Sequence, residues 1–308
     1  VVVLSTGEAV TIDHASLQLI SELSDGRFHS GEIIAQRLGI SRAAVWKRLQ
    51  RMQQQLGLEL HAVRGRGYRL AAPIELLDSE TIRSAVPASA RQSLDSLCVV
   101  PSIDSTNRAA LADPPICSGV ARAWLAEHQT AGRGRRGRHW VSVFGGGLYL
   151  SLAWRFDCGL AELSGLSLLT GVVVAETLDA HGVPDIGLKW PNDVLLDERK
   201  LCGILVEAVG EADGPATAVI GIGLNMRMSK TSAADIDQPW TDLAAGIVQL
   251  PSRNALAAAL LSGLIEACRA FGSDGASRLV ERWRRYDRLA GRKVAILRAD
   301  RTVSGTYE

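Results

Sequence analysis

The chain has 308 residues, 47% of them hydrophobic, and its 34 basic residues nearly balance 33 acidic ones to give a net charge of +1. This length allows one large domain, or two to three smaller ones with a real core. The near-neutral charge excludes a protein that depends on bulk polyelectrolyte binding, so any nucleic-acid contact should be local. None of the five cysteines forms a C-x-x-C pair. We therefore expect no metal site or disulfide framework, and a reducing, cytoplasmic setting.

Residues 1–72 are predicted to form a winged helix-turn-helix, because three helices and a hairpin follow one another in the order typical of that fold. The first helix is expected to end at Gly26. Ser30 and Ser41 are the expected N-caps of the second and third helices, and Gly57 is the expected end of the third. Two short strands joined by the residues RGRG come next.

Basic residues are concentrated in the third helix and at the tip of the hairpin. From Arg42 to Arg69 seven basic residues stand against Glu59 alone. The helix is the element that would enter a major groove, and the hairpin would touch the adjacent backbone. A solvated basic face on a packing domain is the alternative, and Trp46 could belong to the core. The residues expected to contact DNA are Ser41, Arg42, Trp46, Lys47, Arg48, Arg64 and Arg66.

Residues 73–289 are predicted to form a second, larger domain of the α+β class. Asp78 or Ser79 should cap its first helix. Residues 186–209 contain three successive strands without intervening helices, which favours a mixed sheet flanked by helices.

No apolar run approaching 18 residues is expected, and no membrane association. The longest apolar stretch, residues 166–182, carries Glu176 and Asp179 at helical spacing and is predicted to be a core helix. Residues 290–308 are predicted to start a small β module. Since the chain stops within an expected strand, the native C-terminus is expected to continue.

The stretch HQTAGRGRRGRHW, residues 128–140, allows three interpretations: binding of a nucleic-acid polymer, of a dinucleotide, or of a small phosphorylated ligand. Gly132, Gly134 and Gly137 match G-x-G-x-x-G, but no helical pattern follows, as a dinucleotide fingerprint requires. The stretch is also too short for a polybasic tail. Glycines let backbone N–H groups approach a phosphate and arginines bind it through two donors, so a small anion fits best. An exposed flexible loop is the remaining alternative.

Together with KWPNDVLL, KLCGILVE and GIGLNM, this stretch resembles the biotin–protein ligase family. With the winged helix added, almost the whole chain is similar to bacterial bifunctional biotin ligases that also repress the biotin operon. The resemblance implies activation of biotin with ATP to biotinyl-5'-AMP and transfer of biotin to a lysine of a carboxylase carrier domain. It further implies Mg²⁺ bound through ATP phosphates, operator DNA as a partner, a homodimer when adenylate is bound, and an SH3-like C-terminal module.

The resemblance also implies a set of site residues. The expected biotin contacts are Ser105, Thr106, Asn107, Gln129, Arg133, Gly134, Arg135 and Lys200. The expected ATP contacts are Arg138, Trp140, Lys189 and Asn192. Lys189 and Arg135 are the expected catalytic residues. Lys189 ends an apolar strand, where an unpaired ammonium would be costly and a phosphate would be a natural partner.

Several alternatives stay open for individual residues. Ser105 could act as an N-cap, Trp140 could merely pack on a strand, and Lys189 could be a surface lysine. Gly203 and the run 221–225 are expected to let strands approach the ligand closely.

Three further hypotheses concern the whole protein: an enzyme whose winged helix is only structural, a ligand-sensing repressor without ligase activity, and a lipoate or octanoate ligase. Lys189, Arg135 and Arg138 argue against the second, and the intact loop with KWPND favours biotin over lipoate.

Overall fold

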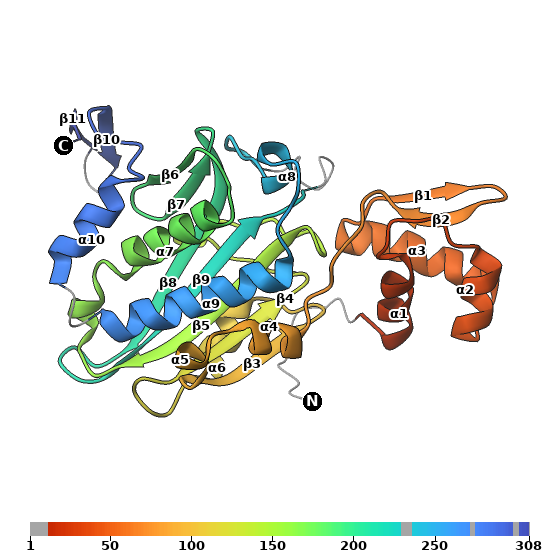
Figure 1. Cartoon of the computed structure of the whole chain (residues 1–308), viewed down its shortest axis with the longest axis horizontal. Helices are drawn as coiled ribbons and strands as arrows, with labels where there is room; N and C mark the ends of the chain where they lie inside the picture. Colours follow the sequence, from red (N-terminus) through yellow and green to blue (C-terminus); the bar gives the residue numbers. More distant parts are fainter. Residues whose placement is uncertain (1–11, 229–235, 272–274, 298–301, 308) are drawn as a thin grey trace.

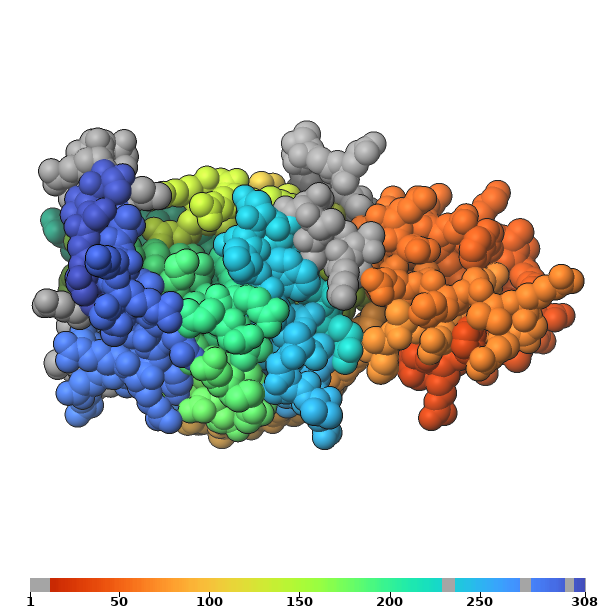
Figure 2. Space-filling model, turned by 90° about the horizontal axis from the view of Figure 1, so that it is seen from above, coloured from red at the N-terminus to blue at the C-terminus, as the bar shows by residue number. Residues whose placement is uncertain are grey.

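The computed structural model describes residues 12–228, 236–271, 275–297 and 302–307. The winged helix forms a lobe at one end of the molecule, and the larger sheet domain makes up the rest (Figures 1 and 2). The α+β fold class is confirmed. The domain boundaries at residues 72/73 and 289/290 stay predictions.

Three helices and a hairpin make up the N-terminal lobe, as predicted. They are α1 (His14–Leu23), α2 (Gly31–Leu38), α3 (Arg42–Leu56), β1 (Leu60–Val63) and β2 (Gly67–Leu70). Ser30 and Ser41 cap α2 and α3: their hydroxyls accept hydrogen bonds from backbone N–H groups. Gly57 ends α3 with a φ of 68°, a left-handed conformation that glycine adopts without a steric penalty. The prediction for α1 was wrong by one turn, because the helix ends at Leu23 and Gly26 belongs to the following turn.

A mixed sheet forms the centre of the larger domain, in the order β3-β4-β5-β9-β8-β7-β6. Only β3 and β4 are parallel, and every other pair is antiparallel. The strands are β3 (Leu94–Val100), β4 (Ala121–Ala126), β5 (Gly147–Phe156), β6 (Ile186–Lys189), β7 (Asp193–Leu196), β8 (Arg199–Gly210) and β9 (Ala216–Asn225). The three successive strands predicted within residues 186–209 are β6, β7 and β8.

Helices cover the two faces of this sheet unequally. The helical elements are α4 (Ser79–Ala85), α5 (Ala88–Arg91), α6 (Thr106–Ala112), η1 (Arg135–Gly137), η2 (Leu160–Leu163), α7 (Leu166–Ala180), α8 (Leu243–Gly246), α9 (Arg253–Ala270) and α10 (Gly275–Arg284). Alternate residues of β5 point to opposite faces: Leu150 and Leu152 pack in the main core with α7 and α9, whereas Ala153 packs against Ala110 of α6. The functional side chains that point from β5 toward α6 are therefore separated from the main core.

The central helix α7 is a core helix, as predicted. The segment Leu160–Ala180 is nevertheless apolar enough over 21 residues to cross a membrane by length and composition. The expectation that no such segment exists was wrong. Half of its apolar window is buried inside the protein, where α7 packs on α9 and on the sheet (Figure 1).

Asp78 rather than Ser79 caps α4, since its carboxylate accepts a hydrogen bond from the Thr81 N–H. The last two strands, β10 (Lys293–Leu297) and β11 (Thr302–Thr306), pair as an antiparallel hairpin. All five cysteines are unpaired.

The two domains share one aromatic side chain. Phe144 follows the arginine-rich loop in sequence, yet its ring is buried in the core of the winged helix, among residues of α1, α2 and α3. Its N–H donates to the carbonyl of Leu56, the last residue of α3, over 3.0 Å. The segment after the loop is thereby attached to the end of the predicted recognition helix.

We expect Phe144→Ala to lower the free energy of unfolding by about 3–5 kcal/mol, because it removes a fully buried ring and leaves a cavity. Urea denaturation of the full chain measures this change. Val248→Ala, at a fully exposed position, is the matched control and should change the free energy by less than about 0.5 kcal/mol. An unchanged midpoint for Phe144→Ala would contradict its role in this core.

A second stability prediction concerns His128, which follows β4. Burial lowers the pKa of this imidazole to about 4, and Ser102 Oγ lies 3.2 Å from its Nδ1. The unfolded chain, with a pKa near 6.5, therefore takes up a proton at a higher pH than the folded chain. The resulting stability is present above pH 6.5 and is lost as the pH falls toward 4.

Between pH 7 and 4.5 we expect wild type to lose about 2 to 3 kcal/mol more free energy of unfolding than His128→Asn, which cannot titrate. Urea denaturation at the two pH values measures the difference. His61→Asn, at an exposed position of β1, should keep the wild-type pH dependence. Equal losses for wild type and His128→Asn would contradict the prediction.

Candidate functional site

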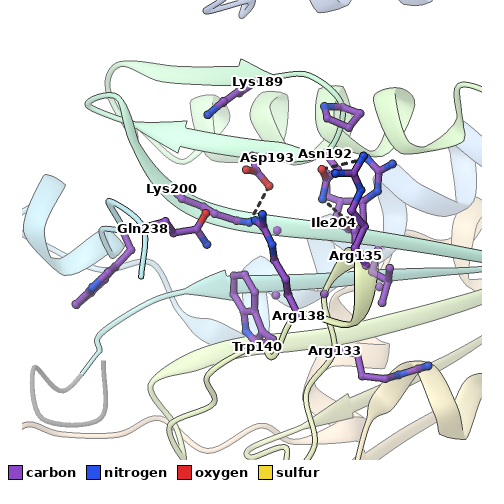
Figure 3. A pocket seen from close by; sticks show the side chains of 18 of the residues that line it. Arg133, Arg135, Arg138, Trp140, Lys189, Asn192, Asp193, Lys200, Ile204 and Gln238 are labelled. Atoms are coloured by element: carbon purple, nitrogen blue, oxygen red, sulfur yellow. Dashed lines mark hydrogen bonds and ion pairs between the residues drawn. The ribbon is translucent and has the colours of Figure 1, made fainter. Parts of the chain in front are cut away.

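A cavity of about 1260 Å³ lies between α6, the arginine-rich loop, the turn after β6, and the middle of β8 and β9. All twelve residues predicted to contact biotin or ATP line it. Figure 3 labels the loop arginines among them, together with Trp140, Lys189, Asn192 and Lys200. The twelve are Ser105, Thr106, Asn107, Gln129, Arg133, Gly134, Arg135, Arg138, Trp140, Lys189, Asn192 and Lys200. The fold thus brings together residues that lie up to 95 positions apart in the sequence.

Neutral polar groups form one part of the cavity, at the start of α6. Gln129 Oε1 accepts hydrogen bonds from the Thr106 N–H (2.8 Å) and the Thr106 hydroxyl (3.1 Å). Ser151 Oγ, on β5, lies 2.8 Å from Thr106 Oγ1 and 2.6 Å from Asn107 Oδ1. Ser105 occupies the N-cap position of α6, but its hydroxyl makes no capping bond. These side chains are all buried, so their geometry is fixed before a ligand arrives.

The arginine-rich loop folds back on itself rather than opening a helix of dinucleotide-binding type. Gly134 N donates to Arg138 O (2.7 Å), and Trp140 N donates to Gly132 O (2.9 Å). A single turn of 3₁₀ helix, η1, forms its tip, with Arg136 at a φ of 57°.

Its arginines diverge. Arg135 Nη1 donates to Asn192 Oδ1 over 3.3 Å, at the turn between β6 and β7. Arg133 instead points away from Arg135 and Arg138 and pairs with Glu207 of β8 at 2.8 Å (Figure 3).

Gly203, Gly221 and Gly223 line the cavity, and their expected role of letting the strands approach a ligand closely stays a prediction. A Cβ at Gly203 or Gly223 would lie within 2.7 Å of the Trp140 ring, and one at Gly221 would lie 2.1 Å from Asn107 Oδ1. Side chains of the protein itself already approach these strands closely. Trp140 packs on β8 and β9, as the alternative interpretation had it, and also lines the cavity.

Cationic side chains dominate the part of the cavity opposite the α6 network. Lys189, the last residue of β6, is exposed. The expectation that its ammonium group would be costly without an anionic partner was therefore wrong. Asn192 follows the cis peptide bond between Trp190 and Pro191, and its Nδ2 donates to Ile204 O over 2.9 Å.

Lys200 pairs with Asp193 at 2.8 Å, and its Nζ lies 5.7 Å from the centroid of the Trp140 ring. The lining cations are Arg133, Arg135, Arg136, Arg138, Lys189 and Lys200, against the carboxylates of Asp193 and Asp237. An excess of guanidinium and ammonium groups over carboxylates suits an anionic ligand.

The sequence analysis did not name several residues in and beside the site. Among the lining residues these include Arg136, Gln238, Trp240 and Tyr307, and Asp193 as the partner of Lys200. Behind the lining they include Ser151 and Glu207. A hydroxyl within the apolar strand LYLSLAW was a signal for Ser151. The pairing of Glu207 with two elements far away in sequence carried no local signal.

The predicted DNA-contacting residues of the winged helix divide into two groups. Six are exposed on α3, its N-cap and the hairpin: Ser41, Arg42, Trp46, Lys47, Arg64 and Arg66. Trp46 is 42% exposed and stacks on Tyr68, so it is not a core residue. Arg48 is half-buried and pairs with Asp13 at 3.2 Å, which ties α3 to the start of α1.

Each of the two predicted domains matches a known protein family. Residues 99–225 match the biotin/lipoate A/B protein ligase family, and residues 16–69 match an HTH domain. The chain is 43% identical to the bifunctional ligase/repressor BirA of Salmonella typhimurium and 41% identical to that of Escherichia coli. Each alignment spans 290 residues and covers 94% of this chain and 88% or 87% of the relative.

A solved structure, the biotin protein ligase from Aquifex aeolicus in complex with biotin and ATP, aligns with a TM-score of 0.56 and 27% sequence identity. The alignment covers 69% of this chain and 86% of that chain. The length of the match to the BirA proteins, from the winged helix through the sheet domain, identifies the chain as a member of the family of bifunctional ligase/repressors.

Proposed function

We propose that the protein is a biotin–protein ligase that also acts as a biotin-responsive repressor. It would activate biotin with ATP to biotinyl-5'-AMP and transfer the biotinyl group to a lysine of a carboxylase carrier domain. The observation that carries the proposal is the convergence of all twelve predicted contacts on one cavity of about 1260 Å³. The division of that cavity into a neutral and a cationic part matches a ligand with a ureido ring at one end and phosphates at the other.

We assign the biotin ring to the network at the start of α6. The ureido group offers two N–H donors and one carbonyl, and buried hydroxyls and an amide can satisfy both kinds of group. Gln129 has its Oε1 occupied by Thr106, which leaves its Nε2 as the group that faces a ligand.

We assign the reacting groups to the arginine-rich loop and the turn after β6. A biotin carboxylate oxygen attacks the α-phosphorus of ATP, the new O–P bond forms, and pyrophosphate leaves. Arg135, which contacts Asn192, would hold the carboxylate and the α-phosphate together, while Arg138 and Lys189 would stabilise charge on the phosphates. Trp140 would offer the exposed part of its ring to adenine.

Magnesium would enter with the nucleotide. Within the part of the chain that the structure describes, no group of three His, Cys, Asp or Glu side chains could hold a metal ion. Mg²⁺ commonly keeps several waters and binds through nucleotide phosphates, which fits a site with few carboxylates. When bound, it would neutralise phosphate charge during the transfer.

In the second step, the amine of the carrier lysine attacks the carbonyl carbon of the adenylate, AMP leaves, and an amide forms. The enzyme has to shield the mixed anhydride from water until the carrier docks.

For repression, we propose that an adenylate-bound homodimer presents two winged helices to operator DNA, with the exposed basic residues of α3 and the hairpin on the phosphates. The unpaired cysteines support a reducing, cytoplasmic setting.

The first test is ATP–pyrophosphate exchange by the full chain with and without biotin, followed by transfer to a carrier domain. We expect exchange that depends on biotin. Exchange that depends on lipoate instead would identify a lipoate ligase, and no exchange by folded protein would overturn the ligase proposal.

Arg135→Ala should release the adenylate roughly 10- to 100-fold faster, because it removes a charge-assisted hydrogen bond, while the fold stays intact. The off-rate of biotinyl-5'-AMP measures this directly. Arg91→Ala, at an exposed position of α5, is the control and should keep the wild-type off-rate. An unchanged off-rate for Arg135→Ala would remove that residue from the site.

For DNA binding, Lys47→Ala and Arg64→Ala should each weaken binding to operator and non-operator DNA alike. Each should reduce the slope of log affinity against log salt by about 1, since each removes one phosphate contact. Titrations at several salt concentrations, with adenylate present, measure the slope. If both variants keep the slope of wild type and of Arg91→Ala, these residues do not face DNA.

A further inference from the structure

A single carboxylate, that of Glu207, is hydrogen-bonded both to the start of α6 and to the arginine-rich loop. Glu207 Oε2, on β8, accepts a hydrogen bond from Asn107 Nδ2 at the start of α6 and another from Arg133 Nη2 on the arginine-rich loop, each over 2.8 Å. The two partners lie 100 and 74 residues away in sequence. Glu207 itself does not line the cavity, and its side chain is 27% exposed.

Both ends of the Asn107 amide are hydrogen-bonded within the protein. Its Nδ2 donates to Leu205 O (3.2 Å) as well as to Glu207, and its Oδ1 faces the hydroxyl of Ser151. Both amide protons are therefore committed, and the carboxylate of Glu207 fixes which end of the amide faces β5. Asn107 then acts on a ligand indirectly, through Ser151 to Thr106, which lines the cavity, rather than by donating to it.

Arg133 uses only one of its five N–H donors on Glu207, which leaves the others for a ligand. Its guanidinium points away from Arg135, which lies beside Asn192, and from Arg138, which extends toward Asp193 and Lys200 (Figure 3). Without the carboxylate, like-charge repulsion from the neighbouring arginines would act on an unanchored side chain. Glu207 thus separates one arginine of the loop from the cationic part of the cavity.

We propose that Glu207 is a positioning residue for biotin. By holding Asn107 and Arg133 at once, it sets the distance and orientation between α6 and the loop at the biotin end of the cavity. The inference rests on the proposed ligase function and deepens it. Because Lys189, Asn192 and Arg138 make no contact with Glu207, the effect belongs to biotin and not to ATP.

The test is Glu207→Gln in biotin-dependent ATP–pyrophosphate exchange, with the KM for biotin and for ATP measured separately. We expect the KM for biotin to rise about tenfold, since a partly exposed charge-assisted bond is lost. The KM for ATP should stay within about twofold of wild type, and the melting temperature should stay unchanged. A merely structural role would not divide the two KM values in this way.

A double-mutant cycle with Arg133→Gln tests the contact itself. If Glu207 acts through Arg133, the double variant should raise the KM for biotin by less than the product of the two single effects. Glu176→Gln is the matched control: it breaks an ion pair of similar length with Arg282 between α7 and α10, and should leave both KM values unchanged.

The outcomes separate the two proposals. A wild-type protein without biotin-dependent exchange overturns the ligase function and this inference together. If the wild type is active, three results would each overturn the inference alone. They are an unchanged KM for biotin in Glu207→Gln, an equal rise in both KM values, and single effects that multiply in the double variant. If Glu207→Gln is unstable, Glu207→Asp takes its place in the cycle, because it shortens the side chain and so breaks the two contacts while it keeps the charge.

Discussion

A buried ion pair between Glu127 and Arg253 holds the functional parts of the molecule in register. Both side chains are only 6% exposed, and their atoms Oε2 and Nη1 lie 2.8 Å apart. Arg253 also donates to Gly147 O at the start of β5, and Glu127 accepts from the N–H of Leu77 in the interdomain segment. Loss of either partner would leave an uncompensated buried charge, which typically costs 3–5 kcal/mol. Because Glu127 lies two residues before Gln129, this pair sets the position of the strand end that carries the ligand-facing amide.

The arginine-rich loop, which begins just after this ion pair, is attached to the rest of the protein at both of its ends. Its start is fixed where Gln129 accepts from Thr106, and its end is fixed where Phe144 enters the winged-helix core and bonds to the end of α3. One segment of fewer than twenty residues therefore contacts the ligand cavity and the DNA-facing domain. Contiguous contacts of this kind give a ligand in the cavity a physical route to the DNA-facing domain.

The cavity combines two kinds of chemistry that each need a different setting. Hydroxyls and amides at the start of α6 are buried and mutually hydrogen-bonded, so they can be preorganised at little electrostatic cost. Arginines and lysines would repel one another if buried together, and accordingly they lie on an exposed loop and at strand ends. Two carboxylates reduce the repulsion among these cations: Asp193 pairs with Lys200, and Glu207 pairs with Arg133.

The sequence by itself determined the order of elements, the capping residues Ser30 and Ser41, and the motif residues that line the cavity, because these depend on short-range periodicity, on capping and on recognisable local patterns. Only the tertiary structure decided that Lys189 is exposed, that Trp140 packs on strand glycines, and that Phe144 belongs to the winged helix. It also decided the pairing of Glu207 with residues 74 and 100 positions away. Such contacts depend on the order of strands in the sheet and on the face to which each side chain points, and no local pattern encodes that order.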